Sequence, residues 1–68
     1  MVNVKEIMAS AKAALVKGEK EAAADFLNKG IGLLGSMTLR GVDKVDGASI
    51  DRWKERFWFQ LEENQLLD

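Results

Sequence analysis

The chain has 68 residues, neither cysteine nor histidine, and ten basic against eleven acidic side chains, for a net charge of −1. This length accommodates one domain, residues 1–68, and the missing cysteine and histidine exclude disulfides and Cys/His zinc sites. A nearly neutral chain has no field of one sign, so its total charge does not favour nucleic acid or an anionic membrane. Regular helix packing and self-association remain as sources of stability for so short a chain.

The first half of the chain predicts a helical hairpin. Apolar residues at three- and four-residue spacing indicate a helix over residues 3–17, with Asn3 as its N-cap and Gly18 as its stop. A second helix is predicted over residues 19–34, and its apolar face consists of Ala23, Phe26, Leu27, Gly30, Ile31 and Leu34. Because the connection around Gly18 is very short, the two helices must run antiparallel.

The turn and the start of the second helix resemble those of a tetratricopeptide-type hairpin. In that family a turn glycine precedes a small residue by five positions and a large apolar residue by nine, as Gly18, Ala23 and Leu27 do here. The family's large aromatic residue in the first helix and its closing proline have no counterpart in this sequence. A hairpin followed by a third helix is also similar in outline to microtubule-interacting-and-transport domains, and that resemblance implies a groove for partner helices.

Residues 35–48 are predicted to form a linker. Gly35, Gly41 and Gly47 interrupt this stretch, and Asp46-Gly47 is a strong turn signal. Its scattered apolar residues indicate that it packs down on the domain, and a short extended piece is compatible with the pattern.

A third helix is predicted over residues 49–67, with Ser49 as its N-cap. A narrow apolar stripe along it is expected to face the hairpin, and consists of Ile50, Trp53, Phe57 and Leu61. The predicted fold class is therefore all-α: a helical hairpin plus a third amphipathic helix, which together form a three-helix domain.

Two aromatic residues of the third helix lie off this stripe and predict a binding surface. On a helical wheel Phe59 lies opposite the stripe, near Leu66, and Trp58 lies roughly a quarter-turn from it. Exposed aromatic residues are typical anchors of protein interfaces. The expected partner-binding residues are Arg56, Trp58, Phe59, Glu63 and Leu66. The alternative is that Trp58 borders the core and Phe59 packs under the linker.

The charges of the third helix are arranged against its dipole, which favours acidic residues first and basic residues last. The front half is basic and the back half is acidic, through Arg52, Lys54 and Arg56 and through Glu62, Glu63 and Asp68. Antiparallel pairing of two copies would bring each basic half against the partner's acidic half. This pattern favours a homo-oligomer, in the simplest case a dimer.

The candidate motifs for cofactors, metals and catalysis do not have their residues at the positions that such sites require. Gly30, Gly32 and Gly35 match G-x-G-x-x-G, but they end a predicted helix, whereas a dinucleotide site needs them between a strand and the start of a helix. Gly30 is instead expected to let two helices approach closely. A calcium loop that begins at Asp43 would have Lys54 at its twelfth position, where a carboxylate is required. No nucleophile has a recognisable activating base, so we expect no catalytic residue, cofactor, metal or enzymatic activity.

The function that the sequence favours is a small protein-interaction module, which acts as a regulator, adaptor or inhibitor, and whose size also fits a phage-encoded protein. The alternative is a small nucleic-acid-binding transcriptional regulator that uses Arg52, Lys54 and Arg56, although neighbouring acidic residues leave that region almost neutral. The sequence has no signal-peptide pattern and no apolar run of about 20 residues, so we expect a cytoplasmic protein without membrane association.

Overall fold

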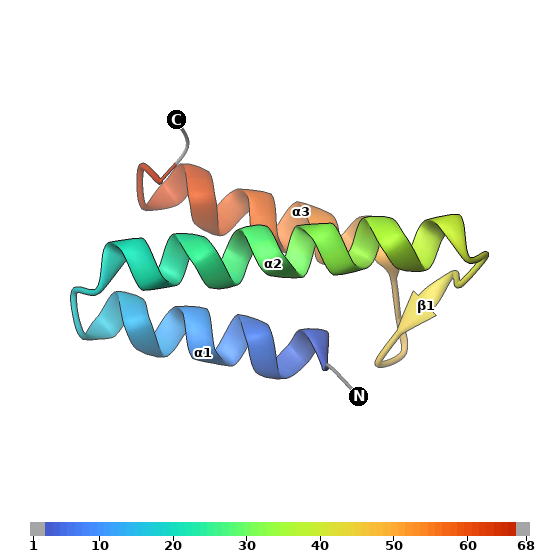
Figure 1. Ribbon diagram of the computed structural model, residues 1–68, viewed down its shortest axis with the longest axis horizontal. Coiled ribbons are helices and arrows are strands. Elements are labelled where there is room, and N and C mark those ends of the chain that lie inside the picture. The colour runs from blue at the N-terminus through green and yellow to red at the C-terminus, as the bar shows by residue number, and fades with distance from the viewer. Residues whose placement is uncertain (1–2, 67–68) are drawn as a thin grey trace.

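The computed structural model describes residues 3–66, and this part of the chain contains three helices and one pair of short strands (Figure 1). The helices are α1 (Val4–Val16), α2 (Lys20–Leu39) and α3 (Ile50–Glu63), and the strands are β1 (Lys44–Val45) and β2 (Ala48–Ser49). Helices α1 and α3 run in the same direction, α2 runs the opposite way, and both α1 and α3 pack on α2 (Figure 1). The predicted helical hairpin with a third helix is confirmed, and the strand pair is an addition to the all-α class.

The two predicted N-caps are confirmed, and they explain where α1 and α3 begin. The Asn3 side chain accepts a hydrogen bond from the backbone N–H of Lys5 at 2.9 Å. The Ser49 hydroxyl accepts one from the backbone N–H of Arg52 at 3.2 Å. Each cap satisfies an amide that has no partner inside its helix.

All three helices end in the same hydrogen-bonded turn, in which a backbone amide returns to the carbonyl five residues earlier. The amide–carbonyl pairs are Glu19 with Ala14, Val42 with Met37, and Leu66 with Leu61. The residue before each of these amides has a positive φ, at Gly18 (79°), Gly41 (81°) and Gln65 (56°). This is the Schellman arrangement, which favours glycine at the positive-φ position. At Gln65 a residue with a side chain holds that conformation.

The second helix is longer than predicted. It continues through Gly35 to Leu39, and the turn that ends it is at Gly41. Gly35 adopts the helical conformation, and Met37 beyond it packs against the core, so burial supports the continued helix. The third helix is shorter than predicted, because it ends at Glu63, while Leu67 and Asp68 lie outside the described residues.

The second half of the predicted linker forms a two-stranded antiparallel hairpin. Lys44 pairs with Ser49 and Val45 with Ala48 across a two-residue turn. Asp46 and Gly47 both have positive φ, as a type I′ turn requires, so the predicted turn is confirmed. The hairpin is tied to α3 by the indole N–H of Trp53, which donates to the Val45 carbonyl at 2.9 Å.

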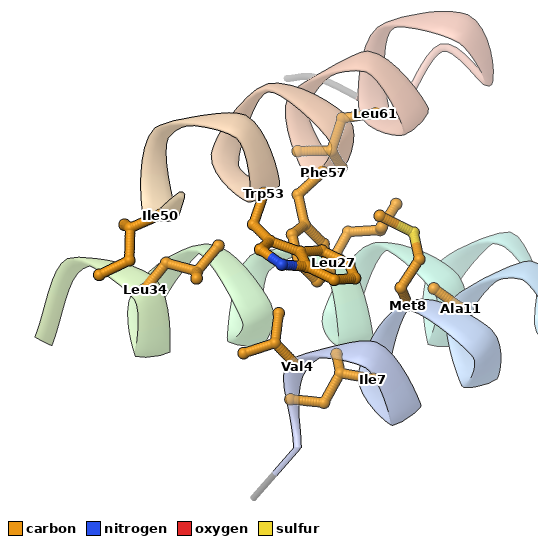
Figure 2. Close-up of a cluster of buried hydrophobic side chains, with 10 residues drawn as sticks. All are labelled: Val4, Ile7, Met8, Ala11, Leu27, Leu34, Ile50, Trp53, Phe57 and Leu61. Atoms are coloured by element: carbon orange, nitrogen blue, oxygen red, sulfur yellow. The ribbon is translucent and has the colours of Figure 1, made fainter. Parts of the chain in front are cut away.

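One core joins the three helices (Figure 2). Its buried side chains are Val4, Ile7, Met8, Ala11, Leu27, Leu34, Ile50, Trp53, Phe57 and Leu61. The predicted apolar stripe of α3 is confirmed, because all four of its residues belong to this core. The predicted close approach at Gly30 is confirmed too: a Cβ at that position would lie 2.5 Å from Cε1 and Cζ of Phe57.

Candidate functional site

A groove with a volume of about 730 Å³ runs between α1 and α3. Helix α1 supplies one wall through Lys5, Met8, Ala9 and Lys12. Helix α3 supplies the other wall through Arg52, Trp53, Glu55, Arg56, Phe59 and Gln60. The groove exists because both helices pack along α2, while their backbones approach each other at few points. Their solvent-facing sides therefore stand apart.

The large apolar side chains of the groove are Met8, Trp53 and Phe59. Met8 and Trp53 are buried at the base, where they also belong to the core. Phe59 is different, because 56% of its surface is exposed to solvent. A large aromatic side chain that remains exposed inside a groove is available to contact a ligand.

Trp53 is held in place on several sides. Its indole N–H is bonded to the Val45 carbonyl, and its ring lies 6.2 Å from the ring of Phe57 in a tilted arrangement. On its outer side the guanidinium of Arg56 lies 4.9 Å from the ring centroid, a cation–π geometry. The base of the groove is thus preorganised, and Arg56 is positioned at its edge.

The groove concentrates positive charge. Lys5 and Lys12 line it from α1, Arg52 and Arg56 line it from α3, and Glu55 is the one acidic residue among its lining side chains. Within residues 3–66 the other six basic and nine acidic side chains lie outside it. The chain as a whole is slightly acidic, so this groove carries a local charge of the opposite sign.

The structure separates the five residues that the sequence grouped as one binding surface. Arg56 and Phe59 line the groove, and Glu63 is exposed one helical turn beyond Phe59. Trp58 is 44% exposed, but it is not part of the groove lining. Leu66 packs against the core instead of lying beside Phe59, because the turn at Gln65 ends the helix and directs the chain back.

The sequence did not point to the α1 wall of the groove. Lys5, Ala9 and Lys12 recur at helical spacing beside the apolar face of α1, as a solvated flank would. These residues form a wall only because α3 lies beside α1 in the tertiary structure. The only sequence signal that could have indicated this wall is that α3 carries basic residues as α1 does.

The structure also shows where the glycine motif and the other candidate sites of the sequence lie. Gly30, Gly32 and Gly35 all lie within α2, so their amides are hydrogen-bonded inside a helix and do not face a ligand. Within residues 3–66 no group of three or more potential metal-binding side chains occurs, and no helix has the length and apolar character to cross a bilayer. Trp53 is buried, so it cannot offer its face to an unpaired base as nucleic-acid recognition would need.

Comparison of the chain with models of protein families, with curated proteins and with solved structures gives no match. The features that define this protein are structural. It is a three-helix domain with a docked β-hairpin, and an open groove between its first and third helices combines an apolar base with basic edges.

Proposed function

We propose that this protein is a protein-interaction module, which acts as a small regulator, adaptor or inhibitor by holding a segment of another protein in the groove between α1 and α3. The observation that supports this function is Phe59, a large aromatic side chain that is 56% exposed within a groove whose base is already fixed. Aromatic residues in such positions supply much of the energy of protein interfaces.

The form of the groove favours a macromolecular ligand over a small molecule. Both Phe59 and Arg56 are exposed, so the groove is open to solvent along α3 and does not enclose a cavity. Small-molecule sites bury most of their ligand's surface. An open groove between two helices is instead the form in which many proteins bind an amphipathic helix.

The test compares two adjacent aromatic residues, one inside and one outside the groove. Proteins captured from a lysate of the encoding organism would be identified, purified and titrated by calorimetry against the wild type, Phe59→Glu and Trp58→Glu. We expect Phe59→Glu to weaken binding by about 30-fold or more, as for a hot-spot residue. Trp58→Glu, which adds the same charge outside the groove, should change the affinity by less than about threefold.

Circular dichroism provides the control for folding, and both variants should retain the helical signal of the wild type because both side chains are exposed. The proposal is wrong if purified partners bind Phe59→Glu as tightly as the wild type. It is equally wrong if Trp58→Glu alone abolishes binding, since the contact surface would then lie on the other flank of α3.

A further inference from the structure

The arrangement of the three helices leaves one position of a four-helix bundle vacant. Helices α1 and α3 each pack on α2 and run antiparallel to it, while their own backbones come close at few points (Figure 1). In a four-helix bundle each helix packs on two neighbours and lies diagonal to the third. The groove occupies the place of the missing helix, diagonal to α2 and adjacent to both α1 and α3.

The length of the groove suits about two turns of an added helix. Its α1 wall extends from Lys5 to Lys12 and its α3 wall from Arg52 to Gln60. At a rise of 1.5 Å per residue these walls are about 10 Å and 12 Å long, and one helical turn is about 5.4 Å. Two or three apolar side chains, at three- and four-residue spacing along one face of the added helix, would therefore pack against the exposed Phe59 and lie over the buried base formed by Met8 and Trp53.

The basic residues stand on both sides of this apolar base. Lys5 and Lys12 flank it on the α1 side, and Arg52 and Arg56 flank it on the α3 side. A helix seated between them would place the residues on both borders of its apolar face next to cations. Acidic residues at those borders would gain favourable electrostatic interactions, whereas basic residues there would be repelled.

From this complementarity we infer that the groove binds an acidic amphipathic helix of another protein, with carboxylates along both borders of a short apolar stripe. This inference rests on the proposed function and names the chemistry of its partner. The helix completes the bundle as its fourth member. It differs from the protein's own helices in carrying negative charge on both borders of its apolar face.

A second copy of this chain fits the groove less well. The apolar stripe of α3 is buried within its own domain, so the α3 helix of a neighbouring copy could offer only its exposed flanks. On the flank opposite to the groove, Trp58 is the one large hydrophobic side chain of α3 that is exposed. A single anchor would leave most of the groove unfilled. Nucleic acid is also less favoured, because binding of unpaired bases uses several exposed aromatic rings and the groove, within residues 3–66, has only one, Phe59, while Trp53 is buried.

The experiment is a selection from a displayed library of random peptides of about 16 residues, a length that can form a helix over the groove. Wild-type protein is the bait, and Phe59→Glu is the bait for counter-selection. We expect the enriched peptides to carry apolar residues at helical spacing with aspartate or glutamate at the bordering positions, and a strongly negative net charge. One enriched peptide is then synthesised and titrated by calorimetry against purified variants.

Charge reversal in the groove should weaken this peptide's binding. We expect Arg52→Glu/Arg56→Glu to reduce the affinity by about tenfold or more, because two attractions become repulsions. The matched control is Lys20→Glu/Lys29→Glu, which changes the net charge equally through two exposed residues of α2 outside the groove. It should alter the affinity by less than about threefold. The milder variant Lys12→Gln, whose exposed side chain carries little risk to folding, should weaken binding by about two- to threefold.

The possible outcomes distinguish this inference from the proposed function. Enriched peptides that have an apolar stripe but are neutral or basic would overturn the inference and leave the interaction module standing. No enrichment over the Phe59→Glu bait would overturn both. Sedimentation that shows a dimer dissociated by Phe59→Glu would make the occupant a second copy. Tighter binding of a thymidine oligonucleotide than of any selected peptide would assign the groove to nucleic acid. Each of these last two results contradicts the inference.

Discussion

The two sides of α3 are covered to very different extents. On the side that faces α2, Phe57 is fully buried, and its ring fills the space that a side chain at Gly30 would need. On the side that faces α1, Phe59 remains 56% exposed, and a groove of about 730 Å³ separates the helices. Two phenylalanines only two positions apart thus differ completely: Phe57 lies in a close-packed helix contact, and Phe59 lies in a groove that is open to solvent.

This difference shows that one short helix can serve stability and binding with separate residues. Residues two positions apart on a helix project about 200° from each other, so the filled and open sides share no side chain at these positions. Substitutions on one side should therefore change the free energy of unfolding, and substitutions on the other should change affinity.

The largest effect is expected from truncating the two phenylalanines. Phe57→Ala should lower the free energy of unfolding by about 3–5 kcal/mol, since it leaves a cavity in the core. A domain of this length has a total stability of roughly 3–10 kcal/mol, so this variant should be mostly or wholly unfolded. Phe59→Ala should change stability by less than about 1 kcal/mol. Urea unfolding followed by circular dichroism measures both, and equal losses would contradict the contrast.

The filled contact can be tested again from the α2 side, with two glycines of the same helix. At Gly30 an added Cβ would lie 2.5 Å from the ring of Phe57, whereas at Gly32 it would meet nothing within 4 Å. Gly30→Ala should therefore lower stability by about 1–2 kcal/mol, because crowding outweighs the gain in helix propensity. Gly32→Ala should raise stability by about 0.5–1 kcal/mol. Opposite signs in urea unfolding are the expected result, and a gain in both variants would mean that α3 yields easily.

The smallest effect concerns the end of α3, where the chain turns back toward the core. Gln65 holds a φ of 56°, which costs a residue with a Cβ more than it costs glycine. Gln65→Gly should raise stability by about 0.5 kcal/mol, which corresponds to an increase in melting temperature of about 2–4 °C. Gln65→Ala, which keeps the Cβ, should give no such increase. A melting temperature that falls in Gln65→Gly would show that the positive φ of Gln65 does not limit stability at this turn.

The helices could be predicted from the sequence because their apolar spacing and their caps are local signals. Asn3 and Ser49 cap the beginnings of α1 and α3, and Gly18 ends α1, as these residue types commonly do. The stripe that includes Trp53 and Phe57 is buried, as its helical spacing predicts. The end of α2 could not be predicted in this way. Glycine has a low helix propensity, but the helix continues through Gly35, and Met37 beyond it packs against the core.

Only the α3 side of the candidate site could be predicted from the sequence, because the other side depends on tertiary packing. The exposed aromatic residues and the cations of α3 were visible in the sequence, but the α1 wall depends on which helices lie side by side. A helical wheel that continues to residue 67 also places Leu66 near Phe59. The wheel has no meaning beyond Glu63, where Asn64 and Gln65 leave the helix.

The indole N–H of Trp53, held by the Val45 carbonyl, gives this protein a built-in optical probe. The chain has two tryptophans, and they lie in unlike surroundings: Trp53 forms part of the groove base under Arg56, and Trp58 is half exposed on the other flank. Indole emission depends on the polarity and the charges around the ring. In a Trp58→Phe protein, all tryptophan fluorescence would come from the base of the groove, so a ligand that displaces Arg56 or excludes water there would change the emission spectrum without any attached dye.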